Sequence, residues 1–177
     1  MTNAPRLRPV PNRPTLVRMA DMERGTRGEA HVHIAAPPEA VYGVVSDVTR
    51  MGEWSPETTK CLWLDGATGA AVGVRFKGSN KRGFVTWSTK PTVVVAEPGR
   101  EFTFDVGTDT RWSYRLEVEG DGTKLTEAFE MLRDMRWYYA FAERWVMQIK
   151  DRKADLERGM TETLQRIKQV VEAETSD

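Results

Sequence analysis

The stretch that decides the fold runs from Glu29 to Pro56 and reads EAHVHIAAPPEAVYGVVSDVTRMGEWSP. Its first six residues alternate between polar and apolar side chains, which is the period of a half-buried strand. Pro37-Pro38 then opens a helix, because proline is tolerated in the first turn, where the N–H it lacks would have no partner. Ser46-Asp47 offers a new N-cap, so we expect one short helix over 40–45 and a second from 48 to about 53.

Downstream of this stretch the chain keeps the period of strands, interrupted by turn signals at intervals of roughly ten residues, which predicts an antiparallel sheet. Six further strands are expected over 59–64, 72–77, 84–97, 100–106, 110–119 and 124–132. Gly78–Gly83 is expected to be a turn. Pro91, inside the longest run, predicts a bulge or an edge position, because proline cannot donate to a ladder. With the first strand this gives about seven strands.

From Trp137 to Ala173 the apolar residues follow the period of a helix. They form one stripe, made of Ala142, Trp145, Ile149, Leu156, Met160, Leu164, Ile167 and Val171. A single helix of this length would measure about 55 Å, well beyond the roughly 30 Å width of a small domain. We therefore expect 155–171 to lie in the concave sheet. The segment 137–149 is expected to be a separate helix, an overhang or a lid, with the seam at Asp151–Lys153.

The bulk composition is that of one ordinary globular domain of 177 residues. Basic and acidic residues are equal at 26 each, so no global field draws the protein to nucleic acid. Cys61 is the single cysteine, which excludes an internal disulfide and favours a reducing, cytoplasmic compartment. No apolar run approaches the roughly 18 residues that a membrane span needs. Residues 1–28 are rich in arginine and proline and are expected to form a partly disordered tail, followed by a domain over 29–174.

Several short motifs together resemble one known family. They are Ala36-Pro37-Pro38-Glu39-x-Val41, Ser46-Asp47-x-x-Arg50, Trp54-Ser55-Pro56, Gly73-x-x-Phe76-x-Gly78, Asn80-x-x-Gly83, Trp87, Glu97-Pro98-Gly99-x-x-Phe102, Trp112-x-Tyr114 and Leu164-x-x-Ile167-Lys168. With them the chain is similar to the START-like or Bet v 1-like (SRPBCC) superfamily, in particular its bacterial polyketide cyclase/dehydrase and lipid transport branch. The resemblance implies an α+β helix-grip fold, in which an antiparallel sheet wraps around a long C-terminal helix. It also implies a cavity between sheet and helix for hydrophobic small molecules.

The strand pattern predicts which side chains face that cavity. On the strands, the candidate ligand-binding residues are Phe76, Phe102, Phe104, Trp112, Tyr114, Glu127 and Phe129, and Trp54, which precedes the strands of the meander, is a further candidate. For most of the apolar members, packing in the core is the favoured alternative, since apolar strand faces are normally buried against something. Trp112 and Tyr114 are the better site candidates, because each brings a polar tip that needs a partner when buried.

Glu127 is the most informative polar residue in the sequence. It shares strand parity with Leu125, Phe129 and Met131, so its carboxyl group is expected to point inward. A buried carboxyl must be ion-paired, hydrogen-bonded or protonated, and Tyr114 or an arginine is the expected partner. The alternative is a bulge at Thr126 that places Glu127 in solvent.

Other constellations are weaker. His31 and His33 lie on one face of a strand and are expected to face solvent, without a third ligand to complete a metal site. Phosphate-binding loops, nucleophile elbows and Cys/His pairs are absent from the sequence, and Cys61 is expected to be a core residue. We expect no metal and no cofactor, and we interpret Asp47 and Arg50 as a helix cap and an ion pair.

The leading functional hypothesis is that the chain binds, or transports, a hydrophobic small molecule such as a lipid or polyketide-like compound. An aromatase/cyclase or dehydratase acting on a polyketide-type substrate is the first alternative. A protein-interaction module related to Hsp90-ATPase activators is the second, and it would use an apolar face on the segment 137–149. The expected partner is a hydrophobic ligand, with no nucleic acid and no membrane span. The sequence indicates no oligomeric state.

Overall fold

Two antiparallel sheets and one long helix make up the structure, a computed structural model that describes residues 22–134 and 151–176. In chain order the elements are β1 (Arg27–Ile34), α1 (Pro38–Ser46), the 3-10 helix η1 (Val48–Glu53), β2 (Thr58–Trp63), β3 (Phe76–Arg82), β4 (Val85–Thr89), β5 (Thr92–Glu97), β6 (Glu101–Val106), β7 (Thr110–Glu119), β8 (Gly122–Met131) and α3 (Arg152–Thr175).

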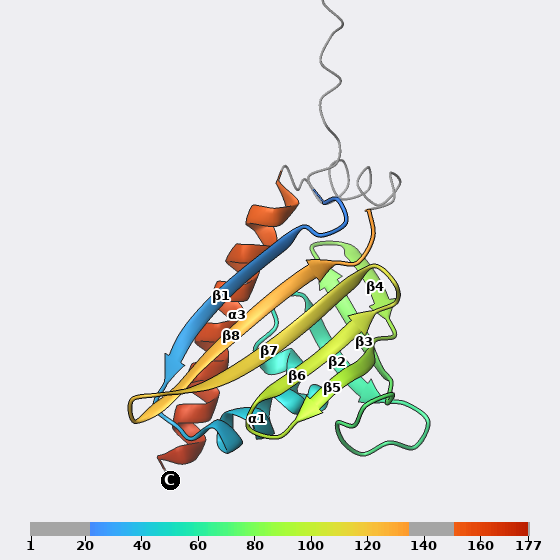
Figure 1. Ribbon diagram of the computed structural model, residues 1–177. Coiled ribbons are helices and arrows are strands. Elements are labelled where there is room, and N and C mark those ends of the chain that lie inside the picture. The colour runs from blue at the N-terminus through green and yellow to red at the C-terminus, as the bar shows by residue number, and fades with distance from the viewer. Residues whose placement is uncertain (1–21, 135–150, 177) are drawn as a thin grey trace, which may run out of the picture.

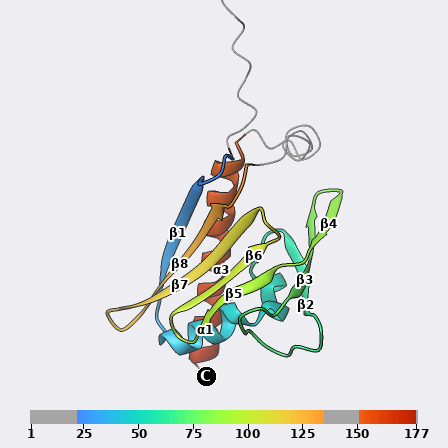
Figure 2. The same ribbon diagram turned by 45° about the vertical axis from the view of Figure 1, so that its right-hand side comes forward.

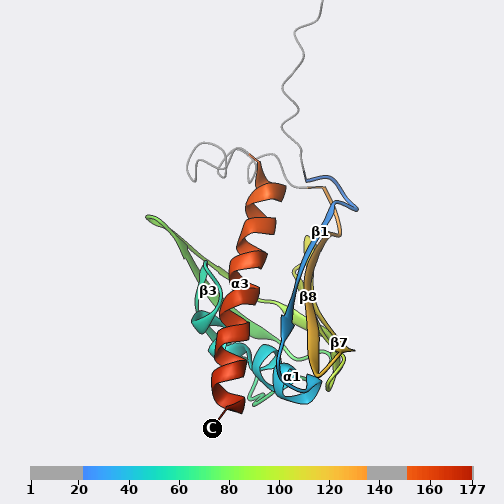
Figure 3. The same cartoon turned by 90° about the vertical axis from the view of Figure 1, so that its left-hand side faces the viewer.

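The larger sheet has the strand order β1-β8-β7-β6-β5, and the smaller one has the order β2-β3-β4 (Figure 1). Seen from the side, α3 runs between the two sheets, and α1 lies near its C-terminal end (Figure 3). The main core lies where α3 and α1 pack on the larger sheet, around Ile34, Val41, Leu125 and Ile167. This arrangement confirms the predicted α+β class, with strands wrapped around a long C-terminal helix and short helices after the first strand.

The segment after β1 folds as its residues predict. Pro38 begins α1, and Glu39 lies in the first turn, where the helix dipole favours a carboxylate. The carboxylate of Asp47 caps η1 by accepting a hydrogen bond from the backbone N–H of Thr49, at 3.1 Å. Arg50 pairs with Glu53 and, at 2.5 Å, with Glu174 near the end of α3. The predicted cap and ion pair are both confirmed, so η1 is tied to the far end of the long helix.

Two strand predictions are wrong. The expected turn Gly78–Gly83 is mostly the second half of β3, and the chain turns only at Gly83, whose φ of 57° suits glycine. The expected single strand 84–97 is two strands, β4 and β5, which belong to different sheets on either side of Pro91. The described part of the chain therefore has eight strands, and the β3–β4 hairpin projects away from the larger sheet (Figure 2).

The long C-terminal helix begins where the seam was predicted, at Asp151 and Arg152. Asp151 caps α3 by accepting a hydrogen bond from the backbone N–H of Ala154, at 2.9 Å. The apolar stripe of α3 is buried from Met160 to Val171. The predicted segment 137–149 lies outside the described residues, so its role as lid, overhang or interface stays a prediction.

The N-terminal boundary differs from the predicted one. Residues 1–21 of the expected tail lie outside the described part, but Met22 is buried against Phe129, Met131 and Met160. Because β1 begins at Arg27, the folded domain reaches N-terminal of Glu29. None of the described helices is both long enough and apolar enough to cross a membrane.

Candidate functional site

A cavity of about 700 Å³ lies between the two sheets and the N-terminal half of α3. Every strand except β1 and β5 contributes to its wall, together with η1, the loop that follows it, and α3. Its volume falls within the roughly 300 to 1,000 Å³ that is usual for small-molecule sites. The cavity is therefore large enough for a ligand of lipid or polycyclic size.

Aromatic side chains form much of the wall. Phe76 and Phe104 meet edge to face with ring centroids 5.2 Å apart, although they come from different sheets. Trp63 supports Phe76 from the other side, with centroids 5.7 Å apart. Aromatic pairs at such distances pack favourably, so this contact joins the two sheets beside the cavity.

The buried polar group of the wall is the pair of Tyr114 and Glu127. The register of β7 and β8 places the two residues directly opposite each other. The Tyr114 hydroxyl donates a hydrogen bond to Oε1 of Glu127 at 3.0 Å, and each residue is only 4% exposed. The register runs unbroken through Thr126, so the alternative of a bulge is excluded. The inward orientation of Glu127 and its partnership with Tyr114 are confirmed.

Burial governs the protonation of this pair. Loss of hydration raises the pKa of Glu127 to about 8, and the hydrogen bond from Tyr114 only partly opposes the rise. The pKa of Tyr114 is raised well above its usual value, first by burial and then by the neighbouring Glu127. Oε2 of Glu127 has no hydrogen-bond partner among the described residues. The carboxyl group is therefore a neutral acid at pH 7, with one oxygen left unpaired.

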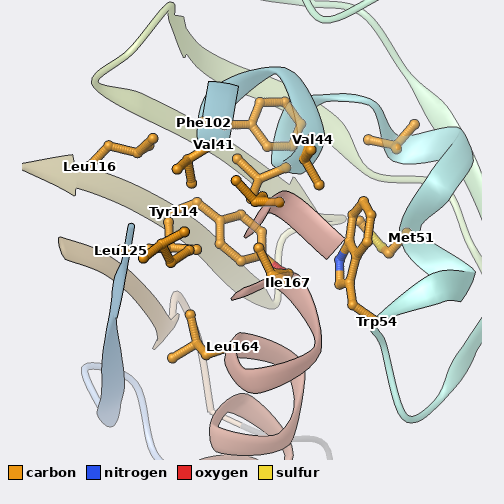
Figure 4. Packing of buried hydrophobic residues seen from close by; sticks show 14 of the residues in the cluster. Val41, Val44, Met51, Trp54, Phe102, Tyr114, Leu116, Leu125, Leu164 and Ile167 are labelled. Carbon is orange, nitrogen blue, oxygen red and sulfur yellow. The ribbon is translucent and has the colours of Figure 1, made fainter. Parts of the chain in front are cut away.

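Trp54 lies behind this pair rather than in the cavity wall. It is fully buried, and Figure 4 shows its indole ring facing Tyr114, with Met51 beside it. The indole N–H lies close enough to lower the pKa of Tyr114, but it makes no hydrogen bond of normal geometry with any described residue. Trp54 thus acts as a packed support for the tyrosine ring.

Charged side chains close one side of the cavity. Both terminal guanidinium nitrogens of Arg82, on β3, bind the carboxylate of Asp155 on α3, at 2.7 and 2.8 Å. Arg82 also binds Glu57 at 2.8 Å, and Asp155 receives further contacts from Arg152 and Arg158. These cations hold the pKa of Asp155 below its usual value. The network joins the smaller sheet to the first turn of α3.

The structure brings together five of the eight predicted site residues. Phe76, Phe104, Trp112, Tyr114 and Glu127 line the cavity. The other three are buried in the core: Trp54 behind Tyr114, Phe102 beside Phe104, and Phe129 against Trp112 with centroids 5.7 Å apart. Contact of any of the eight with a ligand stays a prediction.

The second half of β3 and β4 contribute wall residues that are not among the predicted ones. Asn80 faces the cavity and its side-chain oxygen accepts a hydrogen bond from Thr58 at 2.8 Å, while Trp87 and Thr89 line the wall beside it. Because the sequence predicts a turn over Gly78–Gly83 and one long strand over 84–97, it predicts no inward face for these residues. The signal that could have found them is the alternation through Gly78, Asn80 and Arg82, which continues the inward parity of Phe76.

The weaker candidates keep structural roles. Cys61 is buried, and burial raises the pKa of its thiol to about 11, so it is a core residue rather than a thiolate nucleophile. His31 is exposed, and His33 contacts the backbone carbonyl of Glu119 at 3.1 Å. Within residues 22–134 and 151–176, no three histidine, cysteine or acidic side chains come together as metal ligands would.

Comparison with known proteins identifies the same family that the sequence motifs resemble. The family model described as polyketide cyclase / dehydrase and lipid transport matches residues 26–172. The chain is similar to a polyketide-cyclase-like protein from Corynebacterium glutamicum, at 36% identity over 87% of this chain and 96% of that one, with a TM-score of 0.60.

More distant structures share the fold alone. The KanY protein is 20% identical over 84% of this chain and 98% of its own, with a TM-score of 0.63. Major latex-like protein 151 from Panax ginseng is 13% identical over 84% of this chain and 96% of its own, with a TM-score of 0.60. No curated protein sequence matches this chain.

Proposed function

The chain belongs to the polyketide cyclase/dehydrase and lipid transport family, and from this premise we propose that it binds a hydrophobic small molecule in the cavity between its sheets and α3. Lipids and polyketide-like ring compounds are the proposed ligand classes. The observation that carries the proposal is the cavity itself, of about 700 Å³, which is lined by aromatic rings and methionines, holds the pair of Tyr114 and Glu127, and is closed on one side by charged side chains.

The wall composition supports an apolar ligand. Trp112, Phe104 and Met160 present apolar surface that a ligand would remove from water, and burial of such surface contributes roughly 25 cal/mol per Å². Arg82 and Asp155 also line the cavity, so a bound ligand would lie beside them. They form an ion pair with each other, so neither charge needs a ligand as its partner. This combination suits a carrier, because small-molecule sites are mostly apolar with a few polar groups, and here the charged groups at the edge already pair with one another.

Intrinsic tryptophan fluorescence tests the proposal. Titration with a polycyclic aromatic or fatty-acyl probe should change the emission saturably, because Trp87 and Trp112 line the cavity. Trp112→Phe should remove a large part of that change. Trp63→Phe is the matched control, since Trp63 packs behind Phe76 and does not line the cavity, and it should leave the response largely intact.

Native mass spectrometry of freshly purified protein gives an independent readout, because a carrier should retain a small apolar molecule. If no probe of either class produces a saturable change, and no small molecule accompanies the protein, the binding proposal is wrong.

The Tyr114–Glu127 pair favours an aromatase/cyclase or dehydratase as a second candidate. A general acid or base works best when its pKa lies near the working pH, and the pKa of about 8 for Glu127 meets that condition. In an enzyme, Glu127→Gln should lower turnover of a poly-β-keto substrate by about 10²- to 10⁴-fold while probe binding stays nearly intact. In a carrier there is no turnover to lose.

A further inference from the structure

The carboxyl group of Glu127 has two oxygens in different situations. Oε1 accepts the hydrogen bond from the Tyr114 hydroxyl at 3.0 Å, whereas Oε2 is buried without a partner among the described residues. A buried polar atom without a hydrogen bond is costly, and native structures contain few of them. Because Glu127 also lies in the cavity wall, a ligand is the partner that could satisfy Oε2.

The surroundings decide whether Oε2 is a donor or an acceptor. Across the strands Glu127 faces Ala30 on β1 and Tyr114 on β7, and Trp54 and Cys61 lie close to Tyr114. On the cavity side, α3 contributes Met160 and Thr163. The charged residues that line the cavity are Arg152, Asp155, Arg158 and Glu162 on α3, and Glu57, Lys81 and Arg82 on or before the smaller sheet. No cation affects the ionisation of Glu127, and burial raises its pKa to about 8.

The acid proton therefore has a defined place. At neutral pH the carboxyl group is protonated, and Oε1 is already occupied as an acceptor for the tyrosine proton. The proton of the acid then belongs on Oε2, which makes Oε2 a hydrogen-bond donor inside an apolar wall.

We propose that the free Oε2–H of Glu127 selects the ligand, so that the cavity prefers apolar molecules carrying a neutral acceptor oxygen, such as a ketone or an ester, over plain hydrocarbons and over free carboxylates. This inference rests on the proposed binding function and deepens it. A hydrocarbon would leave the donor unpaired. A carboxylate would add a negative charge beside Glu127. Of the cations in the wall, Arg82, Arg152 and Arg158 already pair with Glu57 or Asp155, and Lys81 is exposed to solvent.

Three pyrene probes of similar shape test the inference: 1-acetylpyrene, 1-ethylpyrene and pyrene-1-carboxylate. At about pH 6 the wild-type protein should bind the ketone about tenfold more tightly than the ethyl compound, as one added hydrogen bond predicts. The carboxylate should bind least tightly. At about pH 9.5 the ionised Glu127 cannot donate, so the preference for the ketone should disappear, while Tyr114 stays protonated.

Two variants control for effects of pH on the fold or on other groups. Glu127→Gln keeps an acceptor for Tyr114 and offers amide N–H donors that do not titrate, so the ketone preference should persist at both pH values. Glu130→Gln changes a glutamate of the same strand that faces Arg27 instead of the cavity, so it should behave as wild type.

The possible failures are distinguishable. If the ketone and the ethyl compound bind equally at pH 6, or if the ketone preference of the wild type is the same at pH 9.5, the inference is wrong although the binding function stands. If the carboxylate binds most tightly, the selecting group is a cation and not Glu127. If none of the three probes binds, the proposed function fails and this inference fails with it.

Discussion

At the scale of single residues, Glu127 is a buried acid whose protonation is coupled to folding. Its pKa rises from an ordinary value of 4.5 in the unfolded chain to about 8 in the folded protein. Between these values the folded state binds more protons than the unfolded state, so the free energy of unfolding decreases as the pH rises. The stabilisation is complete below about pH 4.5 and is lost as the pH passes through about 8.

This coupling predicts an unusual loss of stability toward mildly alkaline pH. Urea denaturation at pH 5, 6.5, 8 and 9 should show a free energy of unfolding that falls by at most about 1.4 kcal/mol for each pH unit and levels off above about pH 8. In Glu127→Gln that slope should vanish, because the amide does not titrate. Glu130→Gln should keep it. A wild-type slope that survives in Glu127→Gln would show that another group causes the effect.

Asp155 and Glu172 have lowered pKa values, so they act elsewhere on the pH scale. Their contribution is present above their ordinary values near 4 and is lost only as the pH falls below them. The two effects have opposite signs and separate pH windows. Measurements above pH 5 therefore isolate Glu127 from these carboxylates.

At the scale of elements, α3 contributes most of its stability through one buried stripe. Leu164 is 1% exposed and packs in the main core with Leu125 and Ile167 (Figure 4). Leu164→Ala should lower the free energy of unfolding by about 2 to 5 kcal/mol, because it leaves a cavity in a close-packed region. Leu62→Ala makes the same chemical change on β2, where the side chain is half exposed, and should cost under about 0.5 kcal/mol. Equal costs in the two variants would contradict the assignment of the buried stripe.

The comparison of β3 with β8 shows what the sequence could and could not predict at this scale. In β8, Leu125, Glu127 and Phe129 lie on the buried face, so a mostly apolar alternation predicted both the strand and the direction of Glu127. The second half of β3 borders a cavity on one face and solvent on the other, so neither face needs apolar residues. Gly78–Arg82 therefore has the composition of a turn, and the signal for a strand is lost.

For the candidate site, Trp54 shows a similar limit to prediction from the sequence. Trp54 is among the predicted ligand-binding residues, but whether a residue lies in the wall of the cavity or behind it depends on packing depth. That depth is set by η1 docking on β2 and by the position of the Tyr114 ring, both of which involve residues far apart in sequence. The period of a sequence predicts which way a side chain points, but not whether other side chains lie between it and the cavity.

At the scale of the whole molecule, the two sheets are separate ladders that meet along one short stretch of backbone. There the N–H of Gly73 and the carbonyl of Val74 form hydrogen bonds with Val93 of β5, and the N–H of Phe76 on β3 donates to the carbonyl of Pro91. Across the cavity, the smaller sheet is joined to α3 by the pair of Arg82 and Asp155. Together with the contact of Phe76 and Phe104, this pair holds the smaller sheet against the rest of the domain.

This arrangement predicts that Asp155→Asn loosens the cavity at neutral pH. The amide cannot form the bidentate, charge-assisted contact with Arg82, and the loss should lower the free energy of unfolding by about 1 kcal/mol. If ligand release requires the smaller sheet to separate from α3, the same loss should speed dissociation of a bound pyrene ketone by about fivefold in stopped-flow measurements. Asp65→Asn is the matched control, because it removes a similar contact with Arg75 on the exposed surface, away from the cavity wall. It should change neither the stability nor the dissociation rate measurably. Equal dissociation rates for wild type and Asp155→Asn would show that the ligand leaves by a route that does not separate β3 from α3.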